Sequence, residues 1–233
     1  MAADRTLVPK VARTRLYEQV AEQITAWIAD AGLGVGDRLP PERELAQQLG
    51  VSRATLSQAL VALEVIGAVT VRHGDGTVIS QTTAGTIAQA IREHADRLPE
   101  ILETRDALET KIAALAAQRR TDEDLAQIEA ALAAMAAEIA AGGRGIDGDE
   151  RFHAAVTAAS HSALLARLMV EIGALVRETR IESLSQPDRP QASLAGHRAI
   201  AAAIAAGDPT AAARAMQDHI GLVSEVALLD DGS

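Results

Sequence analysis

Four side chains in the second half of the sequence are of the types that bind divalent metal ions. Asp149 and His153 are four residues apart in the segment DERFH, so in a helix both side chains lie on one face. His197 and His219 follow in two later segments, GHRAI and MQDHI. One carboxylate and three imidazoles can surround Zn²⁺, Ni²⁺ or Mn²⁺, because imidazole suits borderline metals. Without their neighbours, the same residues are also typical of a helical salt bridge and of polar groups at a core edge.

A second informative segment, LPPERELAQQLGVSRAT at residues 39–55, predicts two short helices joined by a tight turn. Pro40 and Pro41 can open the first helix, because the first helical positions have no N–H partner to lose. Gly50 lies where a left-handed residue would end that helix. Ser52 can cap the second helix. The apolar positions of the second helix are Leu56, Ala59, Leu60 and Leu63.

Two further elements complete this unit. A helix is expected over residues 13–30, with an apolar stripe of Leu16, Val20, Ile24, Trp27 and Ile28. After the two short helices, strands are expected near 68–72 and 77–81, with His73-Gly74-Asp75-Gly76 at the hairpin tip. A helix-turn-helix followed by such a hairpin is winged, and this arrangement predicts DNA binding.

The helix starts of this unit carry the residues with DNA chemistry. An arginine such as Arg43 or Arg53 can reach guanine O6 and N7 or a phosphate. Ser52 and Thr55 can donate hydrogen bonds to phosphate oxygens, and backbone N–H groups at the helix start add to that binding. Arg43 has an alternative role, a salt bridge to a neighbouring glutamate.

The segments RLYEQVAEQI, GDRLPPERELAQQLGVSRATL and ALVALEVIGAVTVRHGDGTVI together resemble the winged-helix domain of the GntR family of bacterial transcription regulators. The resemblance implies that His73 and Gly74 enter the minor groove. In full, it implies DNA contacts by Arg43, Ser52, Arg53, Ala54, Thr55, Ser57, His73 and Gly74.

The chain departs from the family pattern in the second short helix: where it has Ser57-Gln58, relatives often have Arg-Glu. An arginine that makes a good base contact contributes about 1–3 kcal/mol, so the operator sequence cannot be copied from relatives.

The sequence predicts a mainly α protein of two domains. Residues 10–80 form the expected winged helix-turn-helix, QTTAGT at 81–86 is the expected linker, and 87–229 are expected to be an antiparallel bundle of six to seven helices. Strand signals are absent from this second part. Helices are expected there at about 98–115, 125–139, 147–160, 162–184, 190–206 and 209–229.

The second part resembles the all-helical ligand domain, the FCD domain, of FadR-type GntR regulators. It carries the matching segments ETRDALETKIAALAAQRRT, DERFH and HRAIAAAIAAGDPTAAARAMQDHI. In many of those proteins an Asp, a His four residues later and two distant His residues bind a metal. The matching positions here are Asp149, His153, His197 and His219. Arg105 matches an arginine that faces the effector pocket in some relatives, although a surface salt bridge to Glu109 is an equal alternative.

The resemblance implies a homodimer that binds a palindromic operator, controlled by a hydroxy acid or sugar acid held partly by the metal. A repressor is expected, and Zn²⁺ is the favoured ion. One Trp, one Tyr and one Phe leave few stacking partners, which favours a small polar effector. Phe152 is expected inside the bundle, and His94 and His161 match no ligand position. The alternatives are a regulator that responds to metal alone and a small metal-dependent enzyme, although no general base or nucleophile completes an enzyme site.

Composition sets further bounds on these functions. The 233-residue chain has no cysteine, which excludes disulfides and thiolate metal sites. No secretory or membrane-spanning apolar run is evident, so a cytoplasmic protein is expected. Residues 1–80 hold eight Lys and Arg against nine Asp and Glu, whereas the remaining residues hold 14 against 23. The net charge of −10 therefore comes mainly from the second part, and DNA affinity depends on local phosphate neutralisation instead.

Overall fold

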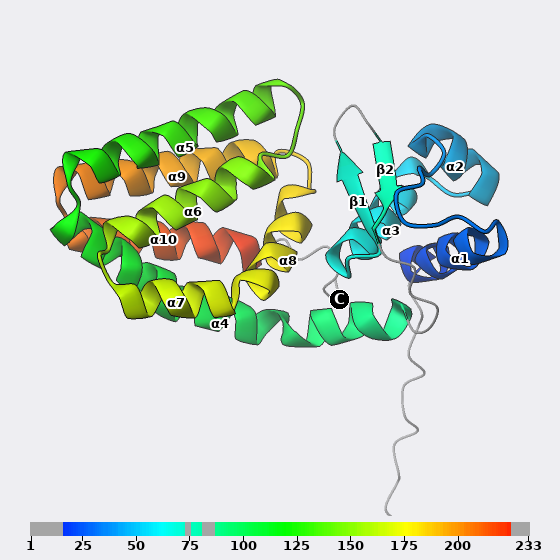
Figure 1. The fold of residues 1–233 in the computed structure, drawn as a ribbon, viewed down its shortest axis with the longest axis horizontal. Helices are drawn as coiled ribbons and strands as arrows, with labels where there is room; N and C mark the ends of the chain where they lie inside the picture. The colour runs from blue at the N-terminus through cyan, green and yellow to red at the C-terminus, as the bar shows by residue number, and fades with distance from the viewer. Residues whose placement is uncertain (1–15, 73–75, 81–86, 225–233) are drawn as a thin grey trace, which may run out of the picture.

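The computed structural model describes residues 16–72, 76–80 and 87–224, excluding the side chains of residues 87–96 and 224. Figure 1 shows a small unit of helices and two strands beside a larger bundle of helices. The described part of the chain is mainly helical, with one two-stranded antiparallel sheet. The predicted fold class, an N-terminal winged helix-turn-helix followed by an all-helical bundle, is confirmed.

The first unit contains α1 (Leu16–Asp30), α2 (Glu42–Leu49), α3 (Arg53–Val65), β1 (Val69–Arg72) and β2 (Gly76–Ile79). The helix α2 ends at Gly50, whose φ of 68° is left-handed, as the sequence predicts. Ser52 caps α3, because its Oγ accepts a hydrogen bond from the backbone N–H of Thr55 at 3.1 Å. In the hairpin, Val69 lies opposite Ile79.

The apolar stripe of α1 is narrower than predicted. Val20, Ile24 and Ile28 are buried, whereas Leu16 is exposed and Trp27 is 37% exposed. The reason is that α1 packs mainly on α3, so residues at the stripe's edge fall outside this contact. Trp27 instead lines a groove between α1 and α2.

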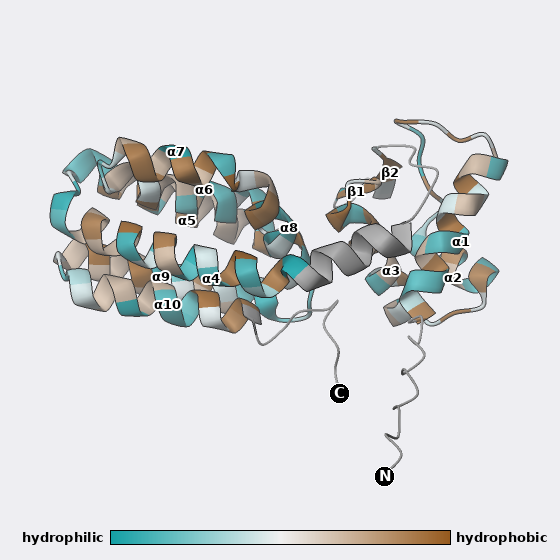
Figure 2. Cartoon of the chain, turned by 90° about the horizontal axis from the view of Figure 1, so that it is seen from below, coloured by the Kyte–Doolittle hydropathy of each residue, from teal (hydrophilic) through white to brown (hydrophobic). Residues whose placement is uncertain are grey.

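The second unit contains α4 (Ile87–Arg119), α5 (Asp122–Ala140), α6 (Ile146–Ala159), α7 (Ala163–Glu171), α8 (Gly173–Leu184), α9 (Arg189–Ala206) and α10 (Pro209–Ser224). Here α4 packs along α10, α5 packs against α6, and α9 packs against both α5 and α10. Hydrophobic and hydrophilic bands alternate along these helices, as expected where one face of each is buried (Figure 2). The core includes Ile112, Met135, Phe152, Ile200 and Ile204.

Two helices replace the single one expected over residues 162–184. The chain leaves the helix at Ile172, and Gly173, a poor helix former, begins α8. The break turns α8 away from α7 and toward the winged-helix unit (Figure 1). This turn has a consequence for packing, since Ile181 of α8 joins the apolar core of the winged-helix unit.

The contact between the two units also includes α3, which packs against α8. The expected linker at 81–86, the hairpin tip at 73–75 and the expected domain ends at residues 10 and 229 lie outside the described residues, so the domain limits stay predictions. Among the helices that are described, none has the length and apolar character needed to cross a membrane.

Candidate metal centre and DNA-binding surface

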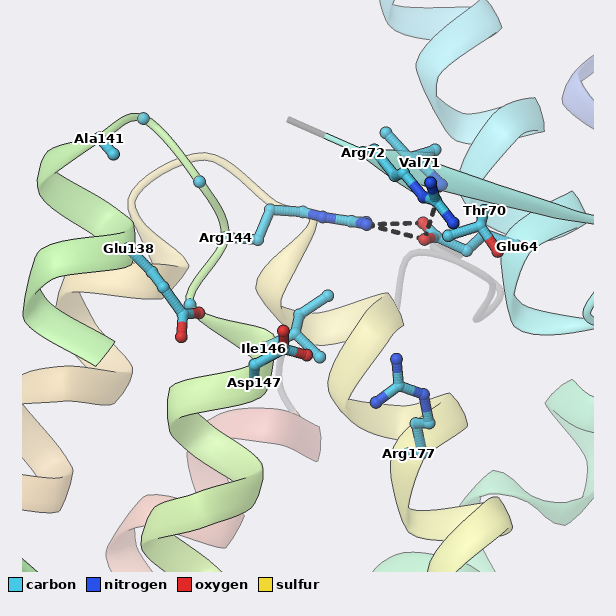
Figure 3. Close-up of a pocket in the computed structure, with 13 residues that line it drawn as sticks. Glu64, Thr70, Val71, Arg72, Glu138, Ala141, Arg144, Ile146, Asp147 and Arg177 are labelled. Atoms are coloured by element: carbon cyan, nitrogen blue, oxygen red, sulfur yellow. Dashed lines mark hydrogen bonds and ion pairs between the residues drawn. The ribbon is translucent and has the colours of Figure 1, made fainter. Parts of the chain in front are cut away.

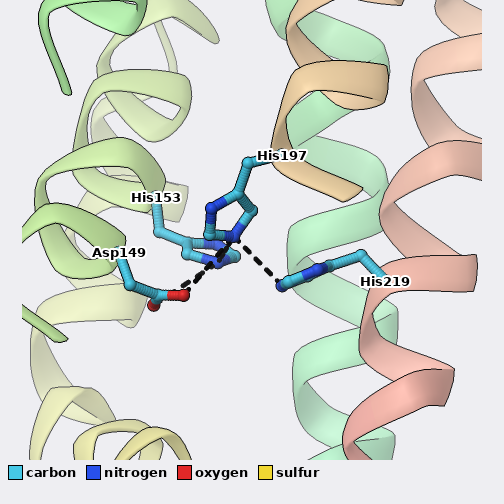
Figure 4. Close-up of side chains that lie close together, drawn as sticks. All are labelled: Asp149, His153, His197 and His219. Carbon is cyan, nitrogen blue, oxygen red and sulfur yellow. Dashed lines mark hydrogen bonds and ion pairs between the residues drawn. The ribbon is translucent and has the colours of Figure 1, made fainter. Parts of the chain in front are cut away.

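Three helices bring the four predicted metal ligands together inside the bundle. Asp149 and His153 lie one turn apart on α6, His197 lies on α9 and His219 lies on α10. All four side chains are buried, and their ligand atoms lie within 4.8 Å of one another. In Figure 4 they converge on one point from two sides.

The distances among these atoms fit a shared cation. The Nε2 atom of His197 lies 3.2 Å from Nε2 of His153 and 3.2 Å from Nε2 of His219. It also lies 3.4 Å from Oδ1 of Asp149. Neighbouring ligands on one ion, at metal–nitrogen distances of about 2.0–2.1 Å, lie about 2.8–3.4 Å apart. One ring proton on His197 cannot serve both imidazoles, whereas a cation satisfies all the converging lone pairs.

The protonation states also suit a metal site. Burial, with the neighbouring charge of His153, lowers the pKa of His197 well below its usual value. Burial likewise lowers the pKa of His219, with smaller contributions from His197 and His153. Both imidazoles are therefore neutral near pH 7, and a neutral imidazole is the form that binds metal. The Nδ1 atom of His219 is buried without a hydrogen-bond partner.

A carboxylate from a fourth helix approaches this cluster. Oε2 of Glu109, on α4, lies 2.5 Å from Nδ1 of His153. Within the described residues neither atom has another polar partner, so the carboxylate oxygen and this ring nitrogen face each other alone. Burial raises the pKa of Glu109, but the charges of Arg105 and His153 outweigh burial and hold it well below the usual value. Glu109 is therefore ionised.

Two guanidinium groups border the cluster. Arg105 is 1% exposed, and its Nε donates to Oε1 of Glu109 at 2.7 Å, while Nη1 donates to Oγ1 of Thr179 at 3.2 Å. The alternative of an Arg105–Glu109 pair is thus present, but the pair is buried and not on the surface. Arg180 places its Nε 2.6 Å from Oδ2 of Asp149. The centre consequently has both cation-binding and anion-binding groups.

Sequence reasoning missed the roles of Glu109, Thr179 and Arg180 at this site. Glu109 gave a signal only as a possible partner of Arg105 four residues earlier. Thr179 and Arg180 gave none, because the predicted 162–184 helix had no turn to bring them beside α4 and α6.

The remaining candidates in the bundle lie as follows. Phe152 is buried and stacks on His197, with ring centroids 4.2 Å apart. His161 is on the surface, where its Nε2 lies 2.8 Å from Oδ2 of Asp124. The side chain of His94 lies outside the described residues.

The predicted DNA contacts gather at the starts of α2 and α3. Arg43 and Arg53 are exposed and make no ion pair with any described residue, so the alternative salt bridge of Arg43 is not seen in that part of the chain. Ser52, Ala54 and Ser57 are exposed as well, and Thr55 is half-buried. The hydroxyls of Ser52 and Thr55 lie 2.8 Å apart. His73 and Gly74 lie outside the described residues.

Comparison with known proteins assigns both units. Residues 16–79 match the family described as bacterial regulatory proteins, gntR family, and residues 100–222 match the FCD domain. The chain belongs to the GntR family. Among its relatives, the HTH-type transcriptional regulator LutR of Bacillus subtilis (strain 168) is 34% identical over 208 residues, covering 85% of this chain and 95% of LutR.

Two further comparisons place this GntR-family chain. The "Putative L-lactate dehydrogenase operon regulatory protein" of Escherichia coli (strain K12) is 33% identical over 224 residues, covering 90% of this chain and 85% of that protein. The solved structure of E. coli McbR/YncC has a TM-score of 0.50 at 20% identity, covering 93% of this chain and 97% of that one. At that identity the likeness shows the fold alone.

The chain is therefore a DNA-binding transcription regulator of the GntR type with an FCD domain. The family and the relatives are transcription regulators and not enzymes, so the alternative of a small metal-dependent enzyme is wrong.

Proposed function

We propose that this GntR-family regulator binds a small organic acid at a divalent-metal site in its bundle, and that the acid controls its affinity for operator DNA. The observation that carries the proposal is the convergence of four buried ligand atoms beside the buried Arg105 and the partly buried Arg180. Burying this many polar groups is unfavourable unless each is paired, which supports a bound cation at the centre.

Asp149, His153, His197 and His219 would hold the cation. The mixture of one carboxylate and three imidazoles favours Zn²⁺, with Ni²⁺ or Mn²⁺ as alternatives. A five- or six-coordinate ion held by these four ligands would supply open positions for a carboxylate or hydroxyl oxygen. These residues supply the neutral nitrogens and the single negative charge that keep the ion in place.

The arginines favour an acidic effector. A guanidinium can bind a carboxylate through two parallel hydrogen bonds, and both Arg105 and Arg180 lie at the metal cluster. One relative is named for an L-lactate dehydrogenase operon. A hydroxy acid such as L-lactate, or a sugar acid, fits this combination of metal and arginine. The scarcity of aromatic side chains supports a small polar molecule.

On the DNA side, we propose a homodimer in the cytoplasm that acts as a repressor. A single winged helix contacts a short half-site, and two related by a dyad read a palindrome. Arg43 and Arg53, which are exposed and unpaired within the described chain, are suited to phosphate or guanine contacts. Ser52, Ala54, Thr55 and Ser57 complete the described surface, and His73 and Gly74 would extend it.

The helix α8 offers a path from the effector site to α3. Thr179 binds Arg105, Arg180 pairs with Asp149, and Ile181 packs in the winged-helix core.

A second connection runs through Ser185, which follows α8 and accepts a hydrogen bond from Arg144 at 2.6 Å. Arg144 in turn binds both carboxylate oxygens of Glu64 on α3, at 2.7 and 2.9 Å. Figure 3 shows this pair bridging the cleft of about 560 Å³ between the two units.

The test is fluorescence anisotropy of labelled DNA from the promoter region beside the protein's own gene. Protein loaded with Zn²⁺ and protein treated with chelator are each titrated with L-lactate and other small hydroxy and sugar acids. We expect one acid to change DNA affinity only in the metal-loaded protein. Arg53→Ala should weaken DNA binding without changing Zn²⁺ affinity. His197→Ala should weaken Zn²⁺ binding without changing the DNA affinity of the acid-free protein.

A regulator that responds to the metal alone is the second candidate, because the ligand cluster is complete without an organic molecule. It predicts that Zn²⁺ changes DNA affinity in the absence of any acid. DNA binding that ignores both Zn²⁺ and every acid would contradict both functions.

A further inference from the structure

Glu109 is a carboxylate outside the four-ligand cluster that contacts both a metal-ligand candidate, His153, and an arginine proposed for the effector, Arg105. Its Oε2 faces Nδ1 of His153 at 2.5 Å, and its Oε1 accepts from Nε of Arg105 at 2.7 Å. Its side chain is 3% exposed, so water does not compete for either oxygen. The two oxygens of a single carboxylate thus connect the two halves of the site.

The geometry of the His153 ring indicates which of its nitrogens carries the proton. The metal-facing atom of His153 is Nε2, which lies 3.2 Å from Nε2 of His197. For Nε2 to donate its lone pair, the ring proton must be on Nδ1, the atom that faces Glu109. A carboxylate beside Nδ1–H fixes this tautomer and raises the basicity of the ligating nitrogen.

We infer that Glu109 is a positioning residue that holds the metal-binding tautomer of His153 and the Nε–H of Arg105 at the same time. Metal binding and the orientation of Arg105 are therefore linked even before an organic acid arrives. The inference rests on the proposed function, because it requires that the ligand cluster bind a cation.

Glutamine at this position cannot hold both the ring proton of His153 and the Nε–H of Arg105. A carboxylate presents two acceptors to its two donors, whereas the amide of Glu109→Gln has a single acceptor oxygen. If the amide NH₂ group faces His153, it donates to Nδ1, moves the ring proton to Nε2 and removes the metal-binding lone pair. If it faces Arg105 instead, it opposes Nε–H and leaves this donor unpaired, and the neutral amide oxygen beside His153 supports the ligating ring less than a carboxylate does.

The experiment measures Zn²⁺ affinity by chelator competition and follows the side-chain Nε–H signal of Arg105 by ¹⁵N NMR, assigned with Arg105→Lys. We expect Zn²⁺ to shift this signal in the wild-type protein. In Glu109→Gln we expect about 10–100-fold weaker Zn²⁺ binding, the loss typical of removing a ligand's supporting partner, and no shift at saturating Zn²⁺. Asp106→Asn, a carboxylate on the same helix that binds Thr110, is the matched control and should behave as wild type.

Three outcomes are distinguishable. No Zn²⁺ binding by the wild-type protein would overturn the proposed metal site and this inference with it. Binding by the wild type without a shift of the Arg105 signal, or undiminished affinity in Glu109→Gln, would overturn the inference alone. If Glu109→Gln does not fold, the inference is tested by the Zn²⁺-induced shift of the Arg105 signal in the wild-type protein and by Glu109→Asp, which keeps the charge. Glu109→Asp should retain most of the Zn²⁺ affinity.

Discussion

At the scale of single residues, His219 offers a direct test of the ligand cluster. Replacing it with alanine removes one of the three converging Nε2 atoms. We expect Zn²⁺ affinity to fall by more than the roughly 10–100-fold typical of a supporting partner, because a ligand itself is lost. Chelator competition measures the change. His161→Ala, which removes a surface histidine paired with Asp124, is the control and should leave Zn²⁺ affinity unchanged.

The buried histidines also predict how stability depends on pH in the metal-free protein. Burial lowers the pKa of His197 and His219, so the unfolded chain binds more protons than the folded one below about pH 6.5. The free energy of unfolding is therefore greatest above that pH and decreases as the pH falls through it. Thermal melts of chelator-treated protein between about pH 7.5 and 5.5 should show a falling Tm. A constant Tm over this range would contradict the prediction, and His219→Gln should flatten the slope.

The sequence is informative about some site residues and silent about others. Asp149 and His153 share a helix turn, so their juxtaposition follows from helix geometry alone. His197 and His219 could be added only through the family resemblance, because their approach depends on how α9 and α10 pack. Arg180 could not be found from its own neighbours, since its contact with Asp149 depends on the turn between α7 and α8.

At the scale of elements, the close packing of α5 and α6 fixes where Asp149 lies. A Cβ added at Gly148 would lie 2.4 Å from Cα of Met135, a backbone atom of α5. We expect Gly148→Ala to push the helices apart, to destabilise the protein by about 1–3 kcal/mol and to weaken Zn²⁺ binding through the adjacent Asp149. Urea unfolding and chelator competition measure the two effects.

Gly221→Ala on α10 is the control for that substitution. Nothing lies within 4 Å of a Cβ at Gly221. Alanine should therefore stabilise α10 by about 0.5–1 kcal/mol, because glycine loses more backbone entropy within a helix. Equal stability of Gly148→Ala and wild type would show that the α5–α6 contact is looser than the structure indicates.

The elements themselves were mostly predictable where local signals are strong. Gly50 and Ser52 mark the turn between α2 and α3 by their own backbone and capping preferences, and the structure agrees. The break at Ile172 was missed because the apolar pattern continues through it, and one glycine is tolerated in many helices. After the break α8 packs against α3, and that contact leaves no local trace in the sequence.

At the scale of the whole molecule, the ion pair between Glu64 and Arg144 joins the two units. The side chains are 7% and 23% exposed, and Glu64 also accepts from the backbone N–H of Val71 on β1 at 3.0 Å. A double-mutant cycle of Glu64→Gln and Arg144→Gln should give a coupling free energy of about 1.5–3 kcal/mol in urea unfolding, as charged, largely buried hydrogen bonds do.

Arg151→Gln is the matched control for Arg144→Gln. Arg151 is exposed on α6 and forms no ion pair within the described chain, so its cycle with Glu64→Gln should be additive. Additive effects of Glu64→Gln and Arg144→Gln would mean that the two units are not joined in solution as they are here.

The position of Trp27 gives the molecule a built-in optical reporter. It is the single tryptophan of the chain, it borders the groove between α1 and α2, and the single tyrosine, Tyr17, lies on the same helix. The bundle that would receive metal and acid has neither and is silent under selective tryptophan excitation. A change in Trp27 emission on adding an effector would therefore show that binding in the bundle alters the structure of the winged-helix unit. No dye needs to be attached.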